Sequence, residues 1–317
     1  MSSPLVTVVG EALIDLLPGN DPRDYRAHAG GSPFNVAVAL ARLGARTALM
    51  ARLADHGFGQ ILRDRAAAEG IELGAAARAA EPTTLAIVSL DGVGQASYDF
   101  YVEGTADWQW TDAELRKLPR DTEVLHFGSI ASWTPPGSER IEQLVRDVRA
   151  RNQTLVSYDP NVRPAVLESA SRGRTLVERS VRQAHVVKAG CEDVEWLYPS
   201  HPLDEVCSHW QELGAALVVI TDGARGALAY RDRRRPLRRP GRAIQLVDTI
   251  GAGDSFTAGL LSGLVRRGLH APERLAAIPE AALTEVLDEA VLVSSMTCER
   301  PGADPPRLAP AASSRPT

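Results

Sequence analysis

The chain has 317 residues, and its 35 lysines and arginines against 40 aspartates and glutamates give a formal net charge of −5 at pH 7. This balance argues against a nucleic-acid-binding protein that works through bulk charge, and the sequence has no run of about 18 apolar residues that would span a membrane. The three cysteines have neither metal-site spacing nor an even count, which favours a reduced compartment, so we expect a cytoplasmic protein.

Strand-like and helix-like segments alternate along the chain, an arrangement typical of an α/β fold with a mostly parallel sheet. The first strand is predicted at residues 5–9, and a helix at residues 34–43 is followed by Gly44, a residue type that often ends helices. Further buried strands are predicted at 124–127, 154–158, 185–188 and 216–221, with helices such as 139–150 and 203–213 near them. No linker divides the chain, so we expect a single domain over residues 1–317.

Two stretches break this alternation, at about 11–29 and 84–102, because both look extended without an intervening helix. In the second stretch, Asp91-Gly92 stands between two alternating apolar runs, which is a strong signal for a β-hairpin. Strands inserted between strand–helix units do not easily join the central sheet, so we expect them to form a small separate sheet. A flap of this kind over one edge of the main sheet would serve as a lid.

One glycine-rich segment carries the strongest chemical signal. A β-branched run reaches Gly251, Ala252 and Gly253, and an apolar helix is predicted from Phe256. Small residues at the start of a helix let backbone amides converge on one point, which makes an anion site that phosphate commonly occupies. Asp254 lies among those amides, where its carboxylate would be suited to remove a hydroxyl proton as a general base. The alternative is a helix N-cap, since aspartate caps helices well.

The segment from Asp248 to Phe256 reads Asp-Thr-Ile-Gly-Ala-Gly-Asp-Ser-Phe and resembles the second signature of the ribokinase-like (PfkB) carbohydrate kinases. The first signature of that family also has a counterpart, Gly-Gly-Ser-Pro-Phe-Asn-Val-Ala, which begins at Gly30. The resemblance extends over nearly the whole chain. It implies a three-layer α/β/α domain with a mostly parallel central sheet and a small β-sheet lid. A P-loop kinase is excluded because no Gly-Lys pair occurs.

The resemblance also implies roles for residues at the acceptor end of the site. Asp254 matches the family's catalytic base, which deprotonates the attacking hydroxyl. The amides of Gly251, Ala252 and Gly253 match the anion hole that holds the transferring phosphoryl group. The family's sugar-binding positions are matched by Asp15, Gly30, Gly31 and Asn35. Taken without the resemblance, Gly31 is equally consistent with a turn and Asn35 with a helix N-cap.

The family's nucleotide-binding positions are matched by Lys188, Asp193, Thr221, Gly223 and Gly226. Lys188 and Asp193 are expected to contact phosphate and the waters of Mg²⁺, although Lys188 alone is equally consistent with a surface lysine at a strand end. Where ribokinases carry an Asn-x-x-Glu motif, this chain has Gly190 and Asp193, which removes one side-chain hydrogen bond. Asp248 and the carbonyl of Ile250 match a monovalent-cation site, often for K⁺, with further carbonyls expected from residues 298–302.

The acceptor end carries the information on substrate. The segment Asp-Pro-Asn-Val-Arg that ends at Arg163 is most similar to fructokinases, but it also occurs in 2-keto-3-deoxygluconate kinases, where arginine suits a substrate carboxylate. Tyr101, in the expected lid, could close on a sugar or pack within the lid sheet. We therefore expect an ATP-dependent sugar kinase that uses Mg²⁺ with ATP, takes fructose first, and forms a homodimer through the lid. The alternatives are a ketodeoxygluconate kinase, a ribokinase or nucleoside kinase, and a catalytically silent sugar-binding regulator.

Overall fold

The computed structural model describes residues 3–19, 21, 23–90, 96–232 and 235–307, so the predicted Asp91-Gly92 turn lies outside the described residues. Within them, the largest sheet has the strand order β14-β13-β12-β11-β10-β9-β1-β4. Its strands are β1 (Leu5–Val9), β4 (Arg46–Met50), β9 (Thr122–Gly128), β10 (Leu155–Asp159), β11 (Val186–Gly190), β12 (Leu217–Thr221), β13 (Ala227–Tyr230) and β14 (Leu237–Arg239). The strands from β4 to β12 in that order pair in parallel, whereas β13 and β14 pair antiparallel at one edge.

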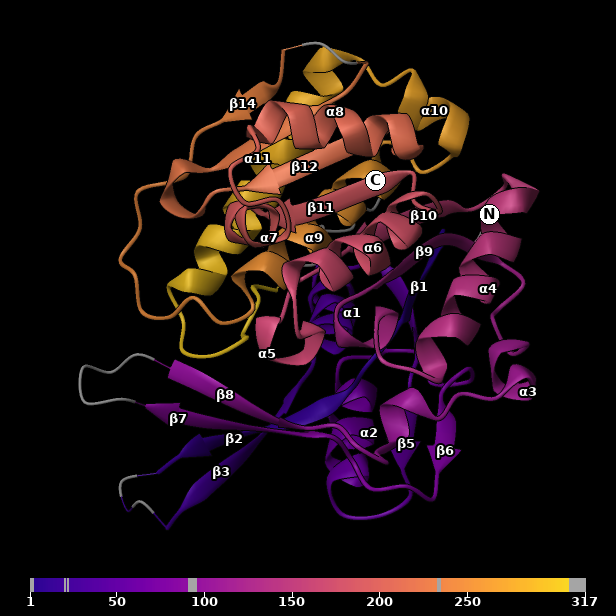
Figure 1. Cartoon of the computed structure of the whole chain (residues 1–317), viewed down its shortest axis with the longest axis vertical. Coiled ribbons are helices and arrows are strands. Elements are labelled where there is room, and N and C mark those ends of the chain that lie inside the picture. The colour runs from indigo at the N-terminus through magenta and orange to yellow at the C-terminus, as the bar shows by residue number, and fades with distance from the viewer. Residues whose placement is uncertain (1–2, 20, 22, 91–95, 233–234, 308–317) are drawn as a thin grey trace, which may run out of the picture.

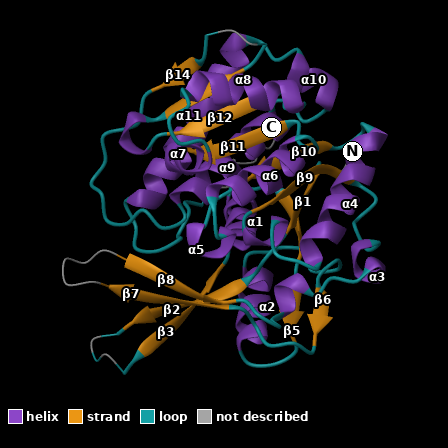
Figure 2. Ribbon diagram, in the orientation of Figure 1, coloured by secondary structure: helices purple, strands orange, loops and turns teal. Residues whose placement is uncertain are grey.

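Helices cover both faces of this sheet and make a three-layer α/β/α arrangement (Figures 1 and 2). One face packs against α1 (Ser32–Arg42), α2 (Phe58–Ala68), α9 (Ala252–Arg266), α10 (Pro272–Ala276) and α11 (Glu280–Cys298). The other packs against α3 (Asp112–Leu115), α4 (Gly137–Arg151), α5 (Pro164–Leu167), α6 (Ala170–Val181), α7 (Cys191–Leu197) and α8 (Leu203–Leu213). Single 3₁₀ turns are η1 (Ala106–Trp108), η2 (Ile130–Ser132) and η3 (Gly223–Arg225). The predicted fold class is confirmed.

The strands supply both cores because successive side chains point to opposite faces. On β12, Leu217 and Val219 join the core that contains α9 and α11, while Val218 and Ile220 join the core on the other side. A continuous apolar run of this kind is typical of a parallel strand that is buried on both faces.

The two stretches that interrupt the alternation form a separate four-stranded sheet in the order β3-β2-β7-β8, as predicted. Its strands are β2 (Leu13–Pro18), β3 (Tyr25–Gly30), β7 (Leu85–Leu90) and β8 (Ala96–Tyr101). Figure 1 shows this small sheet projecting from one side of the main body. A short parallel pair, β5 (Arg52–Ala54) and β6 (Ala77–Ala79), lies beside α2.

Two buried carboxylates lie where the small sheet meets the main body. Asp107, in η1, accepts a hydrogen bond of 2.9 Å from the Ala12 amide, and Glu11 accepts one of 3.0 Å from the Ala131 amide. The second oxygen of Asp107 has no hydrogen-bond partner among the described residues. Burial raises the pKa of both groups to about 7, and their mutual repulsion adds to the rise at Glu11. Each carboxyl therefore keeps its proton to a higher pH than an exposed carboxyl does.

Three neighbouring strands end at or beside residues of the predicted site. β10 ends at Asp159, β11 at Gly190 and β12 at Thr221, and Gly190 is paired in register with Thr221. Ligands of α/β folds bind beyond the carboxyl ends of parallel strands, where loops can approach one another. The start of α9 joins this edge because Thr257 donates a hydrogen bond to Asp159.

Candidate active site

Asp254 occupies the first turn of α9. The helix begins at Ala252, so the predicted start at Phe256 was wrong. Apolar periodicity begins only at Phe256, whereas the preceding turn is helical without carrying that pattern. The N-cap residue is Gly251, in the left-handed conformation with φ of 73°. Asp254 is therefore the third residue of the helix, and its alternative interpretation as the N-cap is wrong.

The carboxylate of Asp254 is held by the first signature segment on α1. Ser32 Oγ donates to its Oδ1 at 2.6 Å, and Asn35 Nδ2 donates to its Oδ2 at 2.9 Å. Burial raises the pKa of Asp254, while these two donors and the charge of Lys188 oppose the rise. The alternative interpretation of Asn35 as a helix cap is wrong, because Gly31 is the N-cap of α1. The sequence analysis did not identify Ser32, since no sequence pattern says which hydroxyl faces a residue on another helix.

Asp15 lies on β2 beside the glycine pair of the first signature. A Cβ on Gly30 would stand 2.0 Å from Asp15 Oδ2, so the carboxylate fills the space that the missing side chain leaves. Burial and the nearby Asp254 raise the pKa of Asp15 to about 6, against the opposing charge of Arg163. Gly31 is also closely approached, since a Cβ there would stand 2.8 Å from the Glu11 carbonyl oxygen. The structure thus brings Asp15, Asp254 and Arg163 into one electrostatic cluster.

Lys188 is buried, with 5% of its surface exposed, so its alternative interpretation as a surface lysine is wrong. Its Nζ lies 2.9 Å from Asp159 Oδ2, which also accepts a hydrogen bond of 3.2 Å from Thr257 Oγ1. Burial opposes the charged form, but Asp159 and the more distant Asp254 hold the pKa of Lys188 above its usual value. The ammonium also lies 2.9 Å from where a Cβ on Gly253 would stand. A positive charge is therefore fixed directly under the predicted anion hole.

A cavity of about 700 Å³ opens beside this ammonium. The predicted nucleotide-binding residues Lys188, Asp193, Thr221, Gly223 and Gly226 all line it, together with Ala252, Gly253 and Arg163. Another part of its wall is apolar and comprises Ile244, Leu246, Phe256 and Val291. This apolar part was not predicted, because residues 240–249 form neither a helix nor a strand and carry no apolar periodicity. The volume suits a ligand of nucleotide size with one polar and one apolar end.

The amide of Ala252, predicted to belong to the anion hole, already donates to the Thr249 carbonyl at 3.2 Å. A phosphate would compete with that contact. Asp193 is likewise engaged, since its carboxylate accepts hydrogen bonds of 3.0 Å from the Gly190 and Val162 amides. Burial raises the pKa of Asp193 to about 6, and the charge of Lys188 opposes the rise. Asp193 thus fixes the turn after β11 at one end of the cavity.

The segments expected to hold a monovalent cation lie side by side. Asp248 accepts hydrogen bonds from the Ile250 amide at 3.0 Å and from the Gly302 amide at 2.7 Å. The Cys298 carbonyl accepts the amides of Val247 and Asp248, at 2.9 and 3.2 Å. In the described ranges no three His, Cys, Asp or Glu side chains gather as a metal-binding set. A cation here would therefore depend on backbone carbonyls together with the single carboxylate of Asp248.

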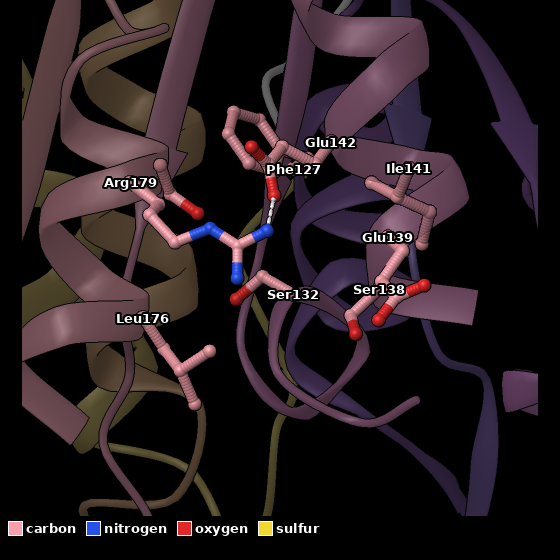
Figure 3. A pocket seen from close by; sticks show the side chains of 9 residues that line it. Phe127, Ser132, Ser138, Glu139, Ile141, Glu142, Leu176 and Arg179 are labelled. Carbon is pink, nitrogen blue, oxygen red and sulfur yellow. Dashed lines mark hydrogen bonds and ion pairs between the residues drawn. The ribbon is translucent and has the colours of Figure 1, made fainter. Parts of the chain in front are cut away.

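Two other places are outside this cluster. Tyr101, at the end of β8, is 58% exposed, so it does not pack fully within the small sheet. Figure 3 shows a second cavity, of about 20 Å³, where Arg179 on α6 is paired with Glu142 on α4. Its volume suits a single water molecule, and its cation is already neutralised. The larger cavity is therefore the candidate ligand site.

The Asp254 carboxylate is thus bonded to polar side chains of α1, and the neighbouring Lys188 and Gly253 line a cavity of nucleotide size. Residues 3–310 match the pfkB family of carbohydrate kinases. The chain is 38% identical to a fructokinase of Rhizobium leguminosarum bv. trifolii over 283 residues, which cover 88% of this chain and 85% of that one.

Two solved fructokinases have similar structures. That of Xylella fastidiosa with bound ATP has a TM-score of 0.86 at 27% identity and covers 95% of this chain and 94% of its own. A double mutant from Vibrio cholerae, with fructose, ADP and potassium ion bound, has a TM-score of 0.83 at 28% identity with the same coverage. The chain belongs to the pfkB family of carbohydrate kinases, so it is a phosphotransferase that acts on a sugar hydroxyl. Among the described helices, none is both long and apolar enough to cross a bilayer.

Proposed function

We propose that this protein transfers the γ-phosphate of Mg-ATP to a hydroxyl of fructose, with Asp254 as the general base. The observation that carries this proposal is the position of Asp254. Its carboxylate is bonded to Asn35 on the acceptor side, while Lys188 and Gly253, next to it, line the nucleotide-sized cavity. The Asp254 carboxylate would thus lie between the sugar and the nucleotide, as a base must in direct transfer between them.

The charge around the acceptor side favours a neutral sugar. Arg163 faces the carboxylates of Asp15 and Asp193, and Asp254 lies close to Asp15. An acceptor carboxylate drawn to Arg163 would approach Asp15 and Asp254 as well, and like charges at this distance repel each other. This balance supports fructose over ketodeoxygluconate, as do the fructokinase relatives.

The proposed reaction follows from the donors and acceptors at hand. Asp15 and Asn35 hold acceptor hydroxyls; the Asn35 amide has a second N–H and a carbonyl oxygen besides the N–H given to Asp254. As the acceptor oxygen forms its bond to the γ-phosphorus, its proton passes to Asp254, and the bond from the γ-phosphorus to the bridging oxygen of ADP breaks. Lys188 and the amides of Gly251 and Gly253 stabilise the charge on the transferring group.

Nucleotide and ions are assigned to the large cavity and its neighbourhood. Mg-ATP would lie along Thr221, Gly223 and Gly226, with its adenine in the apolar part of the cavity. Mg²⁺ would neutralise phosphate charge, and Asp193 would reach it only through water because two amides already occupy its carboxylate. K⁺ would bind at Asp248 and the Ile250 carbonyl, where the hydrogen bond to Gly302 holds the two contributing segments together.

The small sheet would act as the lid over the acceptor, because Asp15 on β2 and Gly30 on β3 belong to both the sheet and the acceptor side. Closure would exclude water, which otherwise competes as a phosphoryl acceptor. Tyr101 would come to the sugar only on closure. Two copies of the chain would form a homodimer through their lids. Residues 1–317 would form one domain, and the protein would act in the cytoplasm.

The substrate is tested by comparing kcat/KM for fructose, ketodeoxygluconate, ribose and adenosine at fixed Mg-ATP. We expect fructose to exceed each of the others by about 10-fold or more, because polar groups placed for one set of hydroxyls discriminate strongly against another. A preference for ketodeoxygluconate would make Arg163 a carboxylate-binding residue and overturn the neutral-acceptor argument. Absence of turnover with all four would support the silent sugar-binding regulator.

A further inference from the structure

Ser32 makes the shortest contact of the base, yet it belongs to a helix far away in the sequence. It is the first residue of α1 and is 92% buried, since 8% of its surface is exposed. Its Oγ lies 2.6 Å from Asp254 Oδ1, across the packed boundary between α1 and α9. A carboxylate can only accept hydrogen bonds, so the hydroxyl of Ser32 is the donor.

A serine at a helix start commonly caps its own helix, but Ser32 does not. The N-cap of α1 is Gly31, and no side chain caps this end. The Ser32 hydroxyl is therefore directed to another element. Since a donor to a charged group is worth more than a donor to a neutral one, this contact favours the ionised form of the base.

The surroundings of Asp254 make such a donor necessary. Asp15 from β2 and Asp159 from β10 add negative charge near it, and burial disfavours the carboxylate form. Lys188 from β11 supplies the opposing positive charge, but that ammonium is already paired with Asp159 at 2.9 Å. Hydrogen bonds from α1 are the remaining stabilisation. Asn35 gives one of them and would also have to bind the acceptor.

We propose that Ser32 is a positioning residue for Asp254: its hydroxyl fixes the rotation of the carboxylate and keeps it ionised while Asn35 engages the sugar. This inference rests on the proposed role of Asp254 as the base. It gives a function in this chain to the third residue of the Gly-Gly-Ser-Pro-Phe-Asn segment, through its hydrogen bond to Asp254.

The test compares Ser32→Ala with Ser262→Ala in pH profiles of kcat/KM for the best acceptor. Ser262 is a buried hydroxyl on α9 that contacts Arg266 at 2.5 Å and is remote from the base, so it is the matched control. We expect the acid limb of Ser32→Ala to move up by about one pH unit, with an unchanged KM for ATP. The loss of kcat/KM relative to wild type should therefore grow as pH falls and approach about 10-fold on the acid side of both midpoints. Ser262→Ala should follow the wild-type profile, and Ser32→Thr should recover most of the shift.

A carboxyl titration followed by infrared difference spectroscopy gives a readout that needs no turnover. The band lost in Asp254→Asn identifies the Asp254 carboxyl, and its midpoint should rise in Ser32→Ala. Superimposed midpoints and superimposed kinetic profiles in wild type and folded Ser32→Ala would overturn the inference. If Ser32→Ala does not fold, Ser32→Thr with a wild-type midpoint supports it, whereas a midpoint shift despite the retained hydroxyl contradicts it. Loss of the proposed function would be recognised separately, as a wild type that phosphorylates no acceptor.

Discussion

The ammonium of Lys188 occupies the space that Gly253 leaves by having no side chain, because a Cβ there would lie 2.9 Å from Nζ. The absence of a side chain at Gly253, in the predicted anion-binding turn, is thus explained by the contact with Lys188 on β11 as much as by the expected approach of phosphate. This contact connects β11 with the start of α9, where Asp254, the proposed base, follows Gly253.

Gly253→Ala should displace the Lys188 ammonium, which Asp159 holds at 2.9 Å and which cannot move freely. We expect kcat to fall about 10- to 100-fold, since small displacements of charged groups at a reacting centre have effects of this size. Gly263→Ala is the control: its Cβ would meet the end of another charged side chain, Glu289, at 3.2 Å, but outside the site. Equal kinetics in the two variants would contradict the role given to Lys188.

Lys188→Met should leave Asp159 buried without its partner and lower the free energy of unfolding by about 3–5 kcal/mol. Adding Asp159→Asn should restore most of that stability without restoring turnover, because the charge under the anion hole stays missing. Denaturant unfolding and steady-state kinetics separate the two effects. Arg46→Met, which breaks exposed pairs with Asp121 and Glu72, should leave the free energy of unfolding close to that of the wild type. Recovery of activity in the double variant would assign the pair a purely structural role.

Because Glu11 and Asp107 are buried carboxyls with raised pKa values, we predict that the free energy of unfolding decreases as pH rises. The pKa of each is about 7 in the folded state, against ordinary values of 4.5 for Glu11 and 3.8 for Asp107, so the folded state holds protons that the unfolded chain releases. The free energy of unfolding should therefore fall between about pH 4 and pH 7. Glu11→Gln should raise stability at pH 8 by about 2–3 kcal/mol and change little at pH 4. A Glu11→Gln curve parallel to wild type across this range would contradict the assignment, and exposed Glu103→Gln is the control.

The sequence predicted most of the architecture because the strands are strongly apolar. The helix α8 was predicted at its observed ends, and the separate small sheet followed from two extended stretches without helices. The start of α9 was missed because residues 252–255 carry no apolar periodicity, although their turn is already helical.

The sequence singled out Asp254 and glycines that line the large cavity, but it could not give the partners of each group. Ser32 meets Asp254 only after α1 and α9 pack together, and Lys188 is buried only because Asp159 accompanies it. The apolar part of the cavity wall includes Leu246, which lies in a segment that is neither helix nor strand. The position of this segment is set by tertiary contacts. Contacts between residues of different helices and strands leave no pattern in the local sequence.

The most direct test of the account is ADP release coupled to fructose in the wild type and in Asp254→Asn. With Mg-ATP, the wild type should release ADP only when fructose is present, and Asp254→Asn should lower kcat by about 10²- to 10⁴-fold while binding fructose with little change in Kd. Fructose-dependent release that persists undiminished in Asp254→Asn would contradict the assignment of the base.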